Sequence, residues 1–189
     1  MSIYKKNLEL LTKNNVYSKE MEHDACGVGL IASTEGKKSR EVVEYGIEAL
    51  KAVWHRGAVD ADGKTGDGAG IHLEIPKDFF IEKIEVTGHN HDGSDICVGM
   101  IFLPRNDYAS QESCKTIVES ELTKNNFSIY GWRQVPVNPK VLGEKAFQTM
   151  PEIIQVLFKS NDKNLIDKDL ERKIYETRKK IENKAFNLS

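Results

Sequence analysis

Residues 22–32 read EHDACGVGLIA, and this stretch carries the strongest indication of the fold. Cys26 stands between a polar, charged leader and a short apolar run, with glycines at Gly27 and Gly29. The run over residues 26–32 predicts a short strand in a buried sheet. Glycines allow another backbone or a ligand to approach closely, which makes Cys26 a candidate nucleophile as well as a candidate core residue.

The composition is typical of a globular domain. The 189 residues, 39% hydrophobic and 30% charged, are enough for one domain with a real core. A net charge of −2 does not indicate a positively charged surface that would bind nucleic acid. Apolar runs are too short for a signal peptide or a membrane span, so we expect a cytoplasmic protein without membrane association. Three cysteines far apart in sequence argue against a disulfide framework in that reducing compartment.

Hydrophobic periodicity predicts further elements on the C-terminal side of this stretch. A helix capped by Ser39 carries Val43, Ile47, Leu50 and Trp54 on one face and stops at Gly57. Strands are expected over residues 71–75, 97–104, 127–137 and 152–158, and helices over residues 110–125 and 165–183. Because some successive strands lack an intervening helix, an all-parallel sheet is not expected.

Residues 57–70, GAVDADGKTGDGAG, predict a loop because glycine and aspartate give the backbone too much freedom for a helix or strand. Gly57 to Thr65 follows the pattern G-x5-G-K-T. A phosphate-binding loop has four residues between its glycines and follows a strand, whereas this loop has five and follows a helix. The motif therefore does not predict a nucleotide site.

Metal-binding patterns are weak. Residues 60–64, DADGK, hint at a calcium loop, but the third ligand position is Lys64 and the twelfth residue is Ile71 instead of glutamate. His-x-x-Cys and His-x-His pairs occur at residues 23–26 and 89–91, and neither has a partner pair at zinc-like spacing. We therefore predict no metal site in this chain.

The other two cysteines are expected to be inert core residues. Cys97 lies in an apolar strand, and Cys114 lies on the apolar face of a helix with Ile117, Val118 and Leu122. A free cysteine in such a place behaves as a small hydrophobic residue. The residue pattern alone leaves Cys26 open between a core residue and a nucleophile.

Several motifs resemble the class II glutamine amidotransferase domain of the glutamate synthase large subunit, in the same order along the chain. The motifs are EHDACGVGLIA, residues 46–80 with His-Arg-Gly-Ala and Thr-Gly-Asp-Gly-Ala-Gly, VGMIFLP (98–104), GWRQVPVNPKVLG (131–143) and ERKIYETRKKIEN (171–183). The resemblance covers nearly the whole chain from Glu22 onward. It implies an α+β fold, a four-layer αββα sandwich of the N-terminal-nucleophile hydrolase type, incomplete at the C-terminus of this chain.

The resemblance also implies how the chain works. Residues 1–25 are expected to be a propeptide-like leader, and residues 26–189 the N-terminal part of the amidotransferase domain. Removal of the leader makes Cys26 the catalytic nucleophile, with its own α-amino group, of pKa about 7.7–8.0, as the base. The implied reaction hydrolyses L-glutamine through a cysteine thioester and releases ammonia. The rest of the enzyme uses this ammonia to convert 2-oxoglutarate to glutamate.

The resemblance also implies further site residues, assigned by their positions in the matching motifs. Arg56 matches the family's loop arginine near the nucleophile. Two roles stay open for its guanidinium: it holds the chain end at Cys26 or the developing negative charge, or it is a structural group that donates hydrogen bonds to loop carbonyl oxygens. Gly27, Asp67 and Gly68 are candidates that support the site, through the architecture of the loop or by lining it. The resemblance places the substrate-carboxylate arginine and the Asn-Gly oxyanion hole beyond this chain, which contains no Asn-Gly dipeptide. We therefore expect little activity from the chain alone.

For the full-length enzyme the resemblance implies FMN, an iron–sulfur cluster and NAD(P)H or ferredoxin, with no cofactor in this chain. The implied partners are L-glutamine, the remaining domains of the large subunit and a small subunit as a further candidate. Two alternatives stay open. One is a catalytically incomplete fragment that acts only as a structural or interaction module. The other is an N-terminal-nucleophile hydrolase of another amide, from which the Thr-Gly-Asp-Gly and Gly-Trp-Arg motifs point away.

Overall fold

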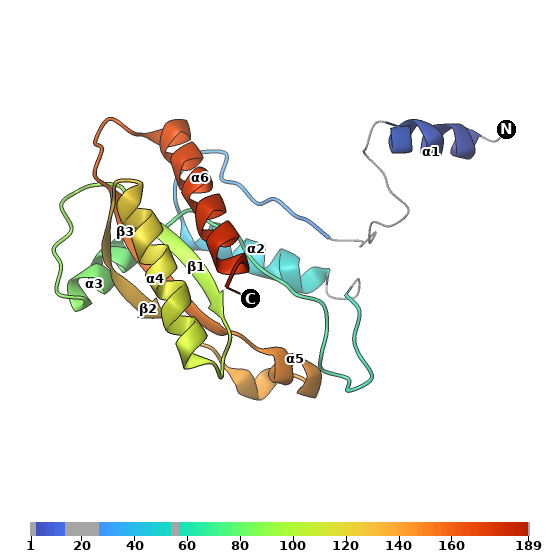
Figure 1. The fold of residues 1–189 in the computed structure, drawn as a ribbon. Helices are drawn as coiled ribbons and strands as arrows, with labels where there is room; N and C mark the ends of the chain where they lie inside the picture. Colours follow the sequence, from blue (N-terminus) through green and yellow to red (C-terminus); the bar gives the residue numbers. More distant parts are fainter. Residues whose placement is uncertain (1–2, 14–26, 54–56, 189) are drawn as a thin grey trace. The chain divides into compact units, whose positions relative to one another are not determined.

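The computed structural model describes residues 3–13, 27–53 and 57–188 (Figure 1). These residues form two compact units. The first contains the described residues up to Gly57 together with Ala69–Ile71, and the second contains Ala58–Gly68 and the described residues from His72 onward.

The first unit contains α1 (Ile3–Lys13) and α2 (Arg40–Ala52). The predicted cap of α2 is confirmed, because the Ser39 hydroxyl accepts the Val42 N–H at 3.3 Å. The predicted apolar stripe of α2 is half-buried where the structure describes it, and Trp54 lies outside the described residues. The helix ends at Ala52, so the predicted stop at Gly57 is five residues too late.

Two predicted strands are wrong. Residues 27–32 have no regular secondary structure, and the Val28 and Leu30 side chains are 94% and 89% exposed. Residues 71–75 are also irregular. An apolar run becomes a strand only when another strand pairs with its backbone, and no described strand pairs with either segment.

The second unit is built on a three-stranded antiparallel sheet with the order β1-β3-β2. Its elements are α3 (Lys77–Val86), β1 (Cys97–Leu103), α4 (Tyr108–Lys124), β2 (Phe127–Gln134), the 3-10 turn η2 (Pro139–Val141), α5 (Glu144–Thr149), β3 (Glu152–Ser160) and α6 (Asp167–Phe186). The strands predicted over residues 97–104, 127–137 and 152–158 are confirmed as β1, β2 and β3, and the expectation that the sheet is not all-parallel holds. Mixed helices with a small antiparallel sheet are compatible with the predicted α+β class.

Both faces of β3 are buried, and alternate residues serve two cores. Val156 and Phe158 pack in a cluster with side chains of α4 and α6, which lie side by side over the sheet in Figure 1. Leu157 points to the opposite face, where it packs in a second cluster with Phe80 and Ile84 of α3. The central strand is therefore fixed in register, because a shift by one residue would exchange the two faces.

The two long helices were predicted correctly from their periodicity. The N-terminus of α4 is capped by Asp107, whose carboxylate accepts the Ser110 N–H at 3.0 Å and the Ser110 hydroxyl at 2.6 Å. Lys184 of α6 donates to the buried carboxylate of Glu121 in α4 at 2.5 Å. The predicted stripe of α6 also packs inward, with Leu170 buried and Ile174 and Ile181 against the same cluster.

Strand β2 contains a bulge between Ile129 and Gly131. Gly131 has φ of 151°, and a Cβ added there would lie 2.8 Å from the Thr87 Cγ2. The Thr87 hydroxyl in turn lies 2.9 Å from the carbonyl oxygen of Tyr130, the extra residue of the bulge. Glycine is required at this position for both its backbone conformation and its lack of a side chain.

The sequence did not predict α1 in the first unit, nor the short elements α3, η2 and α5 in the second. Phe80 and Ile84 of α3 are both buried and stand four residues apart, which is helical spacing. Pro76, directly after the wrongly predicted strand over residues 71–75, is the N-cap of this helix. None of the helices formed by the described residues combines the length and apolar content needed to cross a membrane.

Candidate functional site

Two of the predicted site residues, Cys26 and Arg56, lie outside the described residues. Gly27 is exposed, and the nearest described atom to a Cβ added there is Val53 Cγ2 at 4.0 Å. Asp67 and Gly68 belong to the glycine-rich loop, which the structure describes from Gly57 onward. The surroundings of the predicted site residues are therefore known chiefly from this loop, which contains Asp67 and Gly68.

The loop over residues 58–67 is closed upon itself. Val59 and Gly66 form an antiparallel bridge, and the Asp60 N–H donates to the Thr65 carbonyl oxygen at 2.7 Å. Asp67 closes the base of the loop, because its N–H donates to the Ala58 carbonyl oxygen at 3.2 Å and its carboxylate accepts the Ala58 N–H at 2.8 Å. Asp67 therefore has an architectural role in this loop.

The tip of the loop is organised by the carboxylate of Asp62. One oxygen accepts the backbone N–H groups of Lys64 at 2.9 Å and Thr65 at 2.7 Å, and the other accepts the Thr65 hydroxyl at 2.5 Å. These bonds, above all that from the Thr65 hydroxyl, hold the pKa of Asp62 well below its usual range. Asp62 is therefore charged at neutral pH and already satisfied within the loop.

The same tip rests on the start of α5, which is far away in sequence. The backbone N–H of Glu144 makes a further, smaller contribution to the lowered pKa of Asp62. The Lys145 ammonium lies 2.6 Å from the Asp60 carboxylate, although the two residues are 85 positions apart. Gly143, at the N-cap of α5, is buried against Asp62 and Thr65.

The polar side chains of the loop bond to one another and to the start of α5. Thr65 is bonded to Asp62, and Asp60 and Asp62 serve the loop and α5. Within residues 3–13, 27–53 and 57–188, no group of three or more His, Cys, Asp or Glu side chains could hold a metal ion. The aspartates thus set the shape of the loop.

The structure places Cys97 in the core, as predicted. Its side chain is buried in the cluster between the sheet and α6, and burial raises the pKa of its thiol to about 12. Cys114 is half-buried on α4, and both thiols are free. Because the thiolate is the reactive form, Cys97 is unsuited to nucleophilic chemistry.

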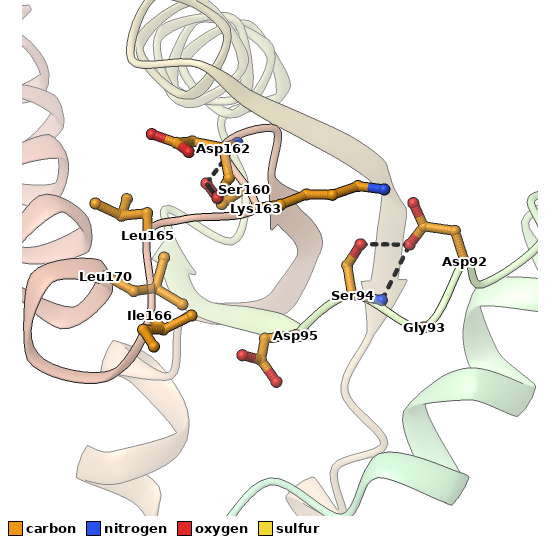
Figure 2. A pocket seen from close by; sticks show the side chains of 10 residues that line it. All are labelled: Asp92, Gly93, Ser94, Asp95, Ser160, Asp162, Lys163, Leu165, Ile166 and Leu170. Carbon is orange, nitrogen blue, oxygen red and sulfur yellow. Dashed lines mark hydrogen bonds between the residues drawn. The ribbon is translucent and has the colours of Figure 1, made fainter.

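A pocket of about 300 Å³ lies between the turn before β1 and the segment after β3 (Figure 2). Its acidic side chains already have partners: Asp92 is bonded to Ser94 and to Lys159, and Asp95 is paired with Lys77. The aliphatic side chains of Leu165, Ile166 and Leu170 gather on the side away from Asp92 in Figure 2. The described site candidates Gly27, Asp67 and Gly68 do not line this pocket.

Sequence reasoning missed the residues that anchor the glycine-rich loop. The sequence pattern indicates Asp60 and Asp62 only as calcium ligands, although Asp followed two or three residues later by a donor is a common turn pattern. Gly143 lies at the end of the quoted GWRQVPVNPKVLG motif. Nothing in the local pattern of this motif indicates contact with a loop some 80 residues earlier.

Comparisons with known proteins identify the family. Residues 26–189 match the class-II glutamine amidotransferases. The chain is 52% identical over 179 residues to the glutamate synthase (NADPH) large chain of Azospirillum brasilense, which covers 95% of this chain and 12% of that relative. It is 40% identical over 174 residues to the ferredoxin-dependent glutamate synthase of Pyropia yezoensis, covering 92% of this chain and 11% of the relative.

A ferredoxin-dependent glutamate synthase of Arabidopsis thaliana is 41% identical over 162 residues, or 85% of this chain and 10% of the relative. The chain thus spans about a tenth of the length of these relatives. The resemblance stated from the motifs is confirmed, and the chain belongs to the class-II glutamine amidotransferases.

Proposed function

We propose that this chain supplies the glutamine-hydrolysing part of a glutamate synthase, with Cys26 as the nucleophile. The observation that carries the proposal is the family match, which begins at Cys26 and runs through residue 189. The similarity to both NADPH-type and ferredoxin-dependent glutamate synthases supports the assignment to that enzyme. The buried, high-pKa thiol of Cys97 is consistent with chemistry at another cysteine.

In the proposed mechanism, residues 1–25 are removed and Cys26 gains a free α-amino group. The amine takes the thiol proton, and the sulfur attacks the side-chain amide carbon of glutamine. The tetrahedral intermediate collapses to a thioester as the amine returns a proton to the leaving ammonia. Water then cleaves the thioester, releasing glutamate and restoring the thiol. While the bond between residues 25 and 26 is intact, this base does not exist.

Arg56, Gly27, Asp67 and Gly68 support the nucleophile in this proposal. The hydrogen bonds between Asp67 and Ala58 fix the chain two residues after Arg56, which supports a role for this loop in shaping the site. The released ammonia passes to the remaining domains, where 2-oxoglutarate is aminated and reduced. FMN, an iron–sulfur cluster and NADPH or ferredoxin belong to that second half-reaction.

We also propose the four-layer αββα arrangement for the whole domain. The support comes from the sheet of the second unit, in which α4 and α6 cover one face. The other face, where Val98 of β1 packs toward α3, carries Met100 and Phe102, and Phe102 is 64% exposed. A second sheet against this face would bury those side chains, as the sandwich requires.

The test is intact-mass analysis of the full-length enzyme that contains this chain, compared with a Cys26→Ala variant. The proposal expects loss of residues 1–25 from the native enzyme, and one adduct at Cys26 with an electrophilic glutamine analogue. A Cys97→Ala variant is the matched control, because it removes a buried thiol and should keep the adduct. An unprocessed, unlabelled enzyme would overturn the mechanism and favour the alternative of a structural or interaction module.

A further inference from the structure

The tip of the glycine-rich loop is clamped by a segment far away in sequence, and three contacts make the clamp. The Lys145 ammonium pairs with the Asp60 carboxylate at 2.6 Å, and the backbone N–H of Glu144 makes a smaller contribution to stabilising the Asp62 carboxylate. Gly143 packs directly against the turn between Asp62 and Thr65. We call residues 143–145 the α5 clamp.

The packing at Gly143 leaves no room for a side chain. A Cβ added there would lie 2.5 Å from the Thr65 backbone nitrogen, and closer still to the Thr65 hydroxyl and the Asp62 carboxylate. The φ of Gly143 is −71°, an ordinary value for any residue, so its conformation does not require glycine. The close approach to the loop is the reason for glycine at this position.

The α5 clamp fixes where the tip of the loop lies. Most residues from Gly57 to Gly70 are exposed. The backbone hydrogen bonds within the loop and those to the Asp62 carboxylate fix its own turns, but they do not join the tip to another element. The ion pair between Lys145 and Asp60 and the packing of Gly143 make that connection, so changes in the α5 clamp are expected to shift the tip.

We propose that Gly143 and Lys145 are positioning residues for glutamine hydrolysis, which hold the loop over residues 58–68 in its working conformation through Asp60, Asp62 and Thr65. This inference rests on the proposed function. Neither residue takes part in bond making. Displacement of catalytic parts by about 1 Å can reduce rates 100-fold, so loss of the clamp should affect turnover more than substrate affinity.

The test uses the full-length enzyme and two assays. Glutamate formation from glutamine depends on the loop, whereas glutamate formation from added ammonium salt bypasses glutamine hydrolysis. Gly143→Ala is expected to lower kcat with glutamine by about tenfold or more with a smaller change in KM, and to leave the ammonium-dependent rate unchanged. Lys145→Gln should show the same pattern more weakly, with Lys140→Gln as the control for loss of an exposed lysine nearby.

A charge exchange separates positioning from general stability. Asp60→Lys and Lys145→Asp should each lower the glutamine-dependent rate, and the double variant should recover part of it. The proposal is overturned if Lys145→Gln and the single charge variants match the native enzyme. It is equally overturned if Gly143→Ala lowers both rates by the same factor. A native enzyme that releases no ammonia from glutamine would instead refute the proposed function.

Discussion

The bulge of β2 provides the sharpest stability test, at Gly131. Gly131→Ala places a Cβ 2.8 Å from Thr87 Cγ2 and 3.1 Å from Thr87 Cβ, at a φ of 151°. Real Cβ contacts are longer than this, so either the strand or Thr87 must move. Movement of Thr87 would disturb the contact between its hydroxyl and the Tyr130 carbonyl oxygen.

Two costs add in this variant. An alanine forced into a backbone region that is almost reserved for glycine costs about 1–3 kcal/mol. Overpacking against Thr87 adds about 1–3 kcal/mol. We expect Gly131→Ala to lower the free energy of unfolding by about 2–6 kcal/mol, which is a large fraction of the stability of a small domain.

Urea denaturation of Gly131→Ala, Thr87→Ser and the double variant measures both costs. Thr87→Ser removes the Cγ2 that the new Cβ would strike and keeps the hydroxyl, so the double variant should recover about 1 kcal/mol relative to the sum of the single changes. The backbone cost should remain in the double variant. A loss below about 0.5 kcal/mol in Gly131→Ala, or strict additivity, would refute this account of the bulge.

Three further predictions concern the second unit. Leu157→Ala, at a fully buried position of the central strand, should lower the free energy of unfolding by about 3 kcal/mol in urea denaturation, and a loss under 1 kcal/mol would contradict the assigned core. The bonds from Ser110 lower the pKa of Asp107, so its stabilisation is present above the ordinary pKa of the carboxyl and is lost as the pH falls through the lowered native value. Melting temperatures of native protein and Asp107→Ala, measured from pH 2 to 7, should therefore converge in acid. Asp107→Asn should keep the cap without this pH dependence. Parallel curves of melting temperature against pH for native protein and Asp107→Ala would be evidence against the assignment. Cys97 should react with a maleimide at pH 8 only after denaturation, as judged by peptide mass, and rapid labelling of folded protein would contradict its burial.

The elements predicted most accurately are long ones of the second unit whose own residues bury a face within that unit. In β1, β3, α4 and α6, the periodicity of apolar residues follows directly from which side chains the structure buries. The failures at residues 27–32 and 71–75 share one cause. Apolar composition there indicates a preference for burial, but a strand also needs a neighbour, which sequence periodicity does not supply.

The candidate site divides in a similar way. The motifs identified Cys26, Arg56 and the glycine-rich loop through resemblance, and the family comparison confirms the family but not the roles of these residues. The loop contacts at Asp60, Asp62 and Gly143 depend on a segment about 80 residues later. Contacts of this kind are set by tertiary packing, so no local pattern could have indicated them.

The strand order β1-β3-β2 has a consequence for synthesis on the ribosome. Of the three strands that the described residues form, the last in sequence occupies the middle of the sheet, between two strands that do not pair with each other. Until residue 160 has left the exit tunnel, β1 and β2 both lack their partner strand. The apolar side chains that later cover β3 then have no β3 to pack against. The nascent chain therefore carries two open strand edges during this interval, a period of vulnerability to aggregation that ends when β3 inserts.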